Sequence, residues 1–273
     1  MKAEAFAPAK INLTLHVTGQ REDGYHLLDS LVAFADIGDR LNLISGPELM
    51  LSIAGEFSNG VPTGHRNLVW QAAEAIGWTG SIHLEKHLPH GGGIGGGSSD
   101  AAAVLRTIIA QGIEMAETAP LSLGADVLVC MQATAARMRG IGEKVEPITL
   151  PPLPALLVNP GITVPTGAIF SALRSRENTP MPADIPGFKT PEDCADWLLG
   201  QRNDLQAPAR SVAPGIADVI DALRDTRDVL LTRMSGSGST CFALYPTLKA
   251  AHFAAYEIGA AQPGWWCRAT MLS

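Results

Sequence analysis

Residues 89–100 read Pro-His-Gly-Gly-Gly-Ile-Gly-Gly-Gly-Ser-Ser-Asp, with six glycines among twelve residues. Glycine loses more backbone freedom on folding than any other residue, so ordering six of them costs on the order of 3–6 kcal/mol. That is a large share of the net stability of a typical domain. The segment is therefore either a flexible linker or an ordered loop that brings bare main chain close to a ligand.

The residues on both sides of the glycines favour the ordered loop. Residues 81–88 alternate between apolar and polar and predict a strand. From Ser98 onward, cap residues and helix formers predict a helix that Gly112 ends, with a buried stripe of Val104, Leu105, Ile108 and Ile109. A helix start after a glycine loop binds phosphate, because its free N–H groups point outward and the helix dipole is positive there.

The best-known phosphate loops do not fit this segment. A P-loop requires Gly-Lys, which the chain lacks. Gly91, Gly93 and Gly96 match the spacing of the dinucleotide fingerprint, but residues 114–120 do not form the second strand that it requires. The glycine loop of protein kinases lies between two strands and does not begin a helix.

Composition excludes several classes of partner. The net charge is −7 and no run of basic residues occurs, which argues against a nucleic-acid partner. No apolar run approaches the roughly 18–20 residues that span a bilayer, so we expect no membrane partner. Four widely spaced cysteines predict reduced core thiols and a cytoplasmic protein: Cys130, Cys194, Cys241 and Cys267.

The rest of the chain predicts segregated helices and strands, an α+β fold. A proline-rich segment at 150–154 divides two expected domains, 1–150 and 151–273. Asn67 and Thr190 are expected helix N-caps. The other expected elements are a strand over 11–17, a turn at 19–24, a helix to residue 76, strands at 155–158, 229–232, 241–245 and 265–271, and helices at 216–223 and 249–258.

Residues 89–102 resemble the ATP-binding motif of the GHMP kinases. Two further blocks stand where that family has its other motifs, Pro8–Leu13 and Met234–Ser239. The resemblance implies a two-domain GHMP kinase fold. It has an N-terminal ATP-binding domain (1–150) like ribosomal protein S5 domain 2 and a ferredoxin-like C-terminal substrate-binding domain (151–273).

Other blocks resemble one branch of the family, the ATP-dependent kinases that phosphorylate a hydroxyl of a cytidyl diphosphate polyol in the non-mevalonate route to isoprenoid precursors. They are Arg21–His26, Leu123–Val127, Gly140–Glu143, Pro165–Phe170 and Asn203–Leu205. The implied partners are small molecules, with the protein a monomer or a weak homodimer.

The resemblance also implies the site residues. Asp126 would accept the proton of the substrate hydroxyl and Lys10 would pair with Asp126. ATP is the expected co-substrate with Mg²⁺, whose ligands stay unassigned. The implied ATP-binding residues are Pro89, His90, Gly91, Gly92, Gly93, Ile94, Gly95, Gly96, Gly97, Ser98 and Ser99. The implied substrate-binding residues are Asn12, Tyr25, His26, Thr166 and Phe170, of which Tyr25 and Phe170 would enclose the cytosine and His26 would hydrogen-bond it.

Each residue also has an ordinary structural interpretation. Asp126 is in a position typical of a helix cap, and Lys10 of a strand lysine with a buried stem. Phe170 fits a helix core position, Tyr25 packing beside a turn, and residues 234–239 a tight hairpin. Two other functions stay open: a GHMP kinase for another small alcohol, of the mevalonate or homoserine type, and a nucleotide-binding paralogue without catalysis.

Overall fold

The computed structural model describes residues 2–273, which form two compact units. Unit 1 holds residues 2–10, 37–90 and 95–133, and unit 2 holds residues 11–36, 91–94 and 134–273. Strands β1 (Lys2–Asn12) and β3 (His26–Ser45) contribute residues to both units. Each unit is thus assembled from distant segments, whereas the sequence predicts a single division near residue 150. That division stays a prediction.

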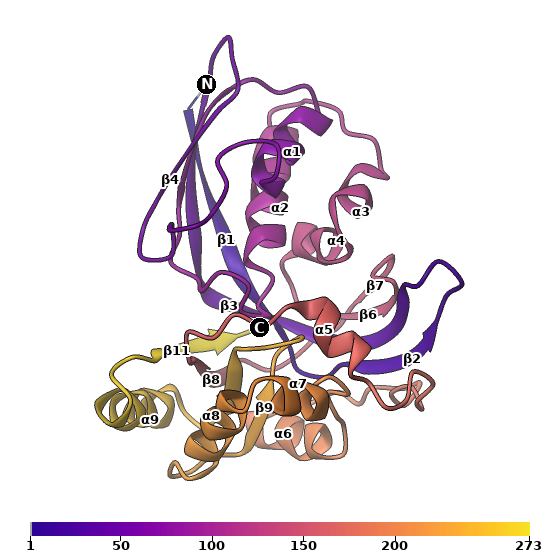
Figure 1. Cartoon of the computed structure of the whole chain (residues 1–273), viewed down its shortest axis with the longest axis vertical. Helices are drawn as coiled ribbons and strands as arrows, with labels where there is room; N and C mark the ends of the chain where they lie inside the picture. The colour runs from indigo at the N-terminus through magenta and orange to yellow at the C-terminus, as the bar shows by residue number, and fades with distance from the viewer. Residues whose placement is uncertain (1) are drawn as a thin grey trace. The chain divides into compact units, whose positions relative to one another are not determined.

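Unit 1 is a sheet with helices on one side (Figure 1). Strand β4 (Met50–Ala54) pairs in parallel with β5 (Gly80–Glu85), and β5 pairs antiparallel with residues 40–45 of β3. Strand β1 also pairs with β3. The helices are α1 (Leu68–Ala75), α2 (Gly96–Ile109), α3 (Ala119–Leu123) and α4 (Ala125–Gln132).

Helix α1 confirms its expected cap, since Asn67 Oδ1 accepts a hydrogen bond from Val69 N at 2.9 Å. Helix α2 begins at Gly96, two residues before the expected start at Ser98. Its N-cap is Gly95 in the left-handed conformation (φ +65°), which turns the chain directly into the helix. The expectation that serine caps α2 is therefore wrong, because Ser98 and Ser99 lie inside its first turn.

Unit 2 contains two antiparallel ladders. In one, β3 lies between β2 (His16–Gln20) and β6 (Ala136–Gly140), and β6 continues to β7 (Lys144–Pro147). The other runs in the order β9 (Leu231–Met234), β10 (Cys241–Leu244), β8 (Leu153–Asn159) and β11 (Trp266–Leu272). The helices of this unit are α5 (Thr166–Ser171), α6 (Pro191–Leu199), α7 (Gln206–Val212), α8 (Gly215–Arg224) and α9 (Leu248–Ala261).

Two expected strands differ in their bounds. The strand expected over 11–17 is interrupted, since β1 ends at Asn12 and β2 begins at His16. Between them, Leu15 turns away to exchange backbone hydrogen bonds with residues 202 and 204. Strand β9 covers 231–234 instead of 229–232. The cap of α6 is as expected, since Thr190 Oγ1 accepts from Asp193 N at 3.1 Å.

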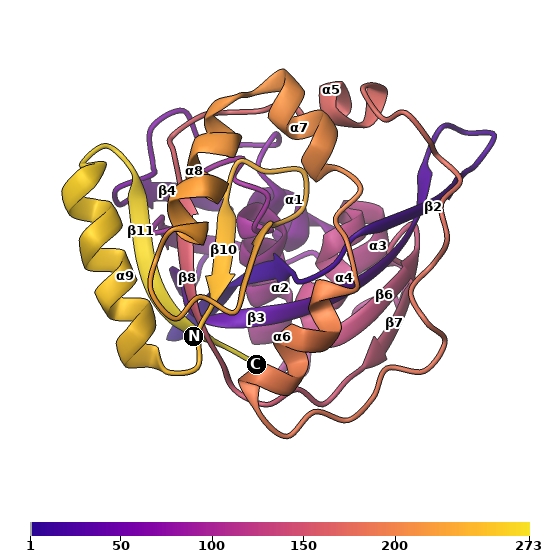
Figure 2. The ribbon, with the colours of Figure 1, turned by 90° about the horizontal axis from the view of Figure 1, so that it is seen from below.

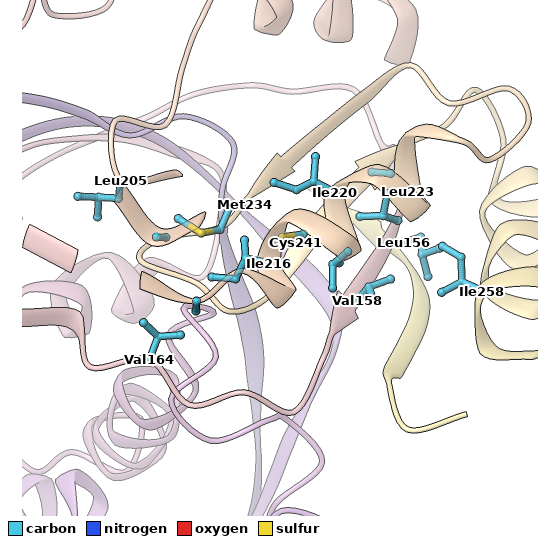
Figure 3. Packing of buried hydrophobic residues seen from close by; sticks show 14 of the residues in the cluster. Leu156, Val158, Val164, Leu205, Ile216, Ile220, Leu223, Met234, Cys241 and Ile258 are labelled. Carbon is cyan, nitrogen blue, oxygen red and sulfur yellow. The ribbon is translucent and has the colours of Figure 1, made fainter. Parts of the chain in front are cut away.

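The core of unit 2 lies between helices and the second ladder, with α8 and α9 packed against its strands (Figure 2). Figure 3 shows Ile216, Ile220 and Leu223 of α8 in one buried cluster with Leu156 and Val158 of β8. Cys130, Cys194 and Cys241 are buried, as the sequence predicts, and Cys267 is half-buried. In the described part of the chain, the helices are too short or too polar to cross a bilayer.

Candidate active site

Lys10 and Asp126 form an ion pair in unit 1. Lys10 Nζ lies 2.9 Å from Asp126 Oδ2, and the two side chains are 4% and 33% exposed. Lys10 lies in the buried part of β1, and Asp126 is in the first turn of α4, where the helix dipole favours an acid. The N-cap of α4 is Gly124, so Asp126 is not the cap. A buried ammonium thus holds a carboxylate that stays accessible to a ligand.

The start of α2 lies against this pair. A Cβ atom on Gly95 would lie 3.1 Å from Lys10 Cε and 3.2 Å from Lys10 Cβ, so glycine permits the close approach. The first helical hydrogen bond runs from Ser99 N to Gly95 O at 2.8 Å. The amides of the preceding residues 96–98 have no helical acceptor and are therefore suited to bind an anion.

A second charged cluster lies in unit 1 against Gly96, near the end of the glycine loop (residues 91–97), and the sequence did not reveal it. Lys86 Nζ donates to Asp39 Oδ2 and, at 2.8 Å, to Asp100 Oδ2. All three side chains are buried. The sequence shows only Lys86 in the segment that predicts a strand and Asp100 in a helix with an apolar stripe. Nothing in the sequence, however, connects these residues with Asp39.

Burial and charge shift the pKa values in this cluster. Burial raises the pKa of Asp100 to about 8, because Lys86 only partly offsets it and the neighbouring Asp39 carboxylate adds to it. Burial alone would lower the pKa of Lys86, but Asp100 and Asp39 outweigh it and raise that pKa. Two buried oxygens at this end of α2 have no hydrogen-bond partner within the described residues, Ser99 Oγ and Asp100 Oδ1. Buried polar atoms without a partner are rare, and each of them calls for an explanation.

The remaining part of the glycine loop belongs to unit 2 and packs against the loop between β9 and β10. Ser235 Oγ donates to Gly93 O at 2.9 Å, and Thr240 N donates to Gly92 O at 3.0 Å. A Cβ on Gly93 would lie 2.6 Å from Ser235 O and 2.7 Å from Gly238 O. The glycine segment is therefore an ordered loop held by backbone contacts.

Asn12 extends this part of the site. Its backbone N–H donates to Ser235 Oγ at 3.1 Å, and its Nδ2 donates to Ser30 Oγ at 2.8 Å. Asn203 braces the same loop by donating from Nδ2 to the carbonyls of Met234 and Gly236. Asn12 is two positions after Lys10 in the same strand, with Ile11 between them.

Two of the residues expected to bind the substrate, His26 and Phe170, lie against each other in unit 2. The rings of His26 and Phe170 are stacked, with centroids 4.5 Å apart and an interplanar angle of 26°. His26 Nε2 is buried without a hydrogen-bond partner in the described structure. Burial, together with the positive charge of Arg176, lowers the pKa of His26. His26 is therefore a neutral ring with an unused nitrogen at neutral pH.

The other expected substrate residues are placed as follows. Tyr25 lies at the β2–β3 turn with 60% of its surface exposed. The structure thus brings His26, and not Tyr25, onto the ring of Phe170, and enclosure of cytosine by Tyr25 and Phe170 stays a prediction. Thr166 Oγ1 and Ser237 Oγ form a hydrogen bond of 3.0 Å. Pro89 is buried and His90 is exposed.

Unit 2 also holds a buried ion pair that the sequence did not predict, between Asp29 of β3 and Arg137 of β6. Asp29 of β3 accepts two hydrogen bonds from Arg137, at 2.8 and 2.7 Å, and one from Met181 N at 2.9 Å. Arg137 also donates to the carbonyls of Pro182 and Ala183. This pair anchors the chain at 181–183 to the sheet. Among residues 2–273, no three His, Cys, Asp or Glu side chains gather as a metal site.

Comparison with known sequences places this geometry in a family. The family GHMP kinases N terminal domain matches residues 67–136, and GHMP kinases C terminal matches residues 190–263. The 4-diphosphocytidyl-2-C-methyl-D-erythritol kinase of Dinoroseobacter shibae is 58% identical, over 98% of this chain and 94% of its own. The protein of that name from Paracoccus denitrificans is 49% identical, over 98% and 96%.

Solved structures agree. A crystal structure of 4-(cytidine 5'-diphospho)-2C-methyl-D-erythritol kinase is 34% identical, with a TM-score of 0.75 over 99% of both chains. Homoserine kinase from Cytophaga hutchinsonii covers 100% of this chain and 94% of its own at 18% identity and a TM-score of 0.65, which shows a shared fold alone. The expected α+β GHMP kinase fold is therefore confirmed. With relatives of this identity along nearly its whole length, the chain belongs to the GHMP kinases and, within them, to the family of the 4-diphosphocytidyl-2-C-methyl-D-erythritol kinases.

Proposed function

We propose that this protein transfers the γ-phosphoryl group of ATP to the 2-hydroxyl of 4-diphosphocytidyl-2-C-methyl-D-erythritol, a step of the non-mevalonate route to isoprenoid precursors. The hydroxyl oxygen forms a bond to the γ-phosphorus, the bond from that phosphorus to the β–γ bridging oxygen breaks, and ADP leaves. The observation that carries the proposal is the contact between Lys10 and Asp126 beside the first turn of α2.

In this reaction Asp126 accepts the proton of the substrate hydroxyl. Its carboxylate is partly exposed, and one oxygen is fixed by Lys10 at 2.9 Å. A positioned base of this kind typically contributes a factor of about 10²–10⁴ to the rate. Lys10 keeps the carboxylate oriented and provides positive charge where negative charge develops on the phosphoryl oxygens.

ATP phosphates are held by the glycine loop. The free amides of residues 96–98 at the α2 N-terminus supply donors without a net charge. Mg²⁺ bound with ATP would neutralise charge on the phosphates.

The substrate is recognised by unit 2. His26 offers an unused ring nitrogen, and Phe170 offers a flat apolar surface to a pyrimidine. Thr166 and Ser237, whose hydroxyls bond each other, and Asn12, whose amide donates to Ser30, carry the polar groups that would bind the rest of the substrate. A cytoplasmic location, and a monomeric or weakly dimeric state, stay predictions.

Turnover of three alcohols in parallel tests the proposal: the cytidyl diphosphate, mevalonate and homoserine, each with ATP and Mg²⁺. We expect ATP-dependent phosphorylation of the cytidyl diphosphate and little of the other two, because neither carries a base for His26 and Phe170. Faster phosphorylation of mevalonate or homoserine overturns the substrate. Binding of ATP without transfer to any of the three identifies a non-catalytic nucleotide binder instead.

A further inference from the structure

The chain that enters the glycine loop is held by Asp39. Strand β5 ends at Glu85, and the following N–H groups of His87 and Leu88 donate to Asp39 Oδ1 at 2.6 and 2.9 Å. Asp39 lies on β3, in the same unit. A side chain thus replaces the neighbouring strand as the acceptor for these two amides.

The chain that leaves the loop is held by the same cluster. Asp100, one residue after Ser99 in α2, accepts from Lys86 Nζ, which also donates to Asp39. The backbone rests directly on this ammonium, since a Cβ on Gly96 would lie 3.4 Å from Lys86 Nζ. One buried ammonium therefore connects both ends of the loop.

The charges of the cluster are buried, which is costly. One ammonium faces two carboxyl groups, and each of the three side chains is at most 4% exposed. Burying an ion pair often gives no net stability over apolar residues of the same volume. A buried cluster that only stabilised the fold would gain little from its charges. Directional hydrogen bonds fix the positions of the backbone segments that they join, which apolar contacts do less strictly.

We infer that Lys86, Asp39 and Asp100 are positioning residues, which fix both ends of the glycine loop and thereby set where the α2 amides meet the ATP phosphates. This inference rests on the proposed function, because it assigns ATP to the loop. The cluster acts through the backbone and does not touch ATP.

The three members differ in what they hold. Asp39 accepts three hydrogen bonds, two from backbone amides and one from Lys86. The two amides donate to Oδ1 and Lys86 donates to Oδ2. Asp39→Asn keeps one acceptor oxygen and turns the other position into an NH₂ donor, which faces either Lys86 Nζ or the two backbone amides, so the link between the loop entry and the ammonium is broken. Asp100 accepts one bond from Lys86, which asparagine can accept as well. The raised pKa of Asp100 agrees with a side chain that is already neutral there.

Steady-state kinetics of Asp39→Asn, Asp100→Asn and wild type test the inference, with ATP and the cytidyl diphosphate varied separately. We expect Asp39→Asn to raise KM for ATP about tenfold, in line with the loss of a buried charge-assisted hydrogen bond, and to change KM for the cytidyl diphosphate less than about twofold. Asp100→Asn should change both KM values less than about threefold.

Asp29→Asn is the matched control, because Asp29 is also buried and also accepts three hydrogen bonds, from Arg137 and Met181, in unit 2. Its thermal stability should fall as in Asp39→Asn, while KM for ATP stays at the wild-type value. Equal KM values for ATP in the two variants, raised or unchanged, overturn the inference.

Lys86→Met is a second variant in case Asp39→Asn does not fold. Methionine keeps much of the length of the side chain and removes the donor, so KM for ATP should rise and KM for the cytidyl diphosphate should not. An unchanged KM for ATP in Lys86→Met overturns the inference. If wild type phosphorylates none of the alcohols, the proposed function fails. ATP affinity by calorimetry then decides the role of the cluster, since equal affinity of wild type and Lys86→Met rejects it.

Discussion

Asp126 lies in the first turn of α4 with Oδ2 2.9 Å from the buried Nζ of Lys10 on β1. The contact joins a strand and a helix whose residues are 116 positions apart (126 − 10). One carboxylate oxygen is engaged by the ammonium, and the side chain keeps 33% of its surface exposed. A carboxylate in this state is oriented by the ammonium, and it stays accessible to a hydroxyl of a ligand.

Asp126→Asn should abolish turnover while binding persists. The amide keeps the shape and loses the basicity, so we expect kcat to fall by about 10²–10⁴-fold. The dissociation constant for the cytidyl diphosphate by calorimetry should change little. Asp218→Asn, which changes an exposed acid in the first turn of α8, should leave kcat unchanged. Wild-type turnover in Asp126→Asn contradicts the assigned base.

Lys10→Met should reduce kcat by about 10²–10³-fold, because it removes the charge beside the carboxylate and the transferring group. The side chain is nearly fully buried, and methionine fills a similar space. Lys2→Met on the same strand, at an exposed position, is the control and should behave as wild type. A Lys10→Met variant with more than half of wild-type kcat rules out the electrostatic role.

Gly95→Ala should impair the active site beyond its cost in stability. Gly95 has φ +65°, and its new Cβ would lie 3.1 Å from Lys10 Cε. A left-handed alanine costs about 1–2 kcal/mol by itself. Gly112→Ala has the same kind of strain, at φ +86°, with nothing within 4 Å of its Cβ. Urea denaturation should show similar losses in both variants, and only Gly95→Ala should lose turnover. Equal turnover in the two would show that Lys10 tolerates the added methyl group.

Phe170→Ala should weaken binding of the cytidyl diphosphate and leave ATP unaffected. The ring stacks on His26 at 4.5 Å, and loss of an aromatic pair costs about 0.5–1.5 kcal/mol beyond the buried area. KM for the cytidyl diphosphate should rise up to about tenfold. Phe253→Ala on α9, where the ring is 54% exposed, is the control. If KM for both substrates stays unchanged, Phe170 is a core residue of unit 2.

Local signals in the sequence predicted the parts of the fold that depend on neighbouring residues. Asn67 and Thr190 cap their helices through bonds that span two and three residues, so one sequence suffices to predict them. The order of the glycine segment was also predicted, because the strand before it and the helix after it are indicated by patterns of neighbouring residues. The ion pair of Lys10 with Asp126 was expected from family motifs, and spacing alone did not require it.

Long-range contacts limited the rest. Leu15 leaves its expected strand because residues 202 and 204 offer it backbone partners, about 190 residues away along the chain (204 − 15). Lys86 reaches Asp39 across 47 positions, and no local pattern marks that pair. Gly95, which begins α2, was one of six candidate glycines, and Gly91 and Gly93 have a positive φ as well. Its close contact with Lys10 joins residues 85 positions apart (95 − 10), which no local pattern marks.

The buried cluster also predicts how stability depends on pH. The pKa of Asp100 is raised by burial from 3.8 to about 8, so between these pH values the folded protein holds a proton that the unfolded chain has released. The stabilising contribution of this group is complete below its unfolded pKa and is lost as pH rises through its folded pKa. The slope from this one group reaches at most about −1.4 kcal/mol per pH unit.

Urea denaturation at several pH values between about 5 and 8 measures this slope as the free energy of unfolding of wild type and of Asp100→Asn. Asparagine cannot release the proton, so the stability of Asp100→Asn relative to wild type should increase as pH rises. Asp218→Asn, at an exposed position, should follow wild type across the range. Because Lys86 holds its charge throughout this range, its raised pKa adds no slope of its own. If the free energies of unfolding of Asp100→Asn and wild type change in parallel with pH, Asp100 is ionised in the folded protein, and its charge is compensated by Lys86.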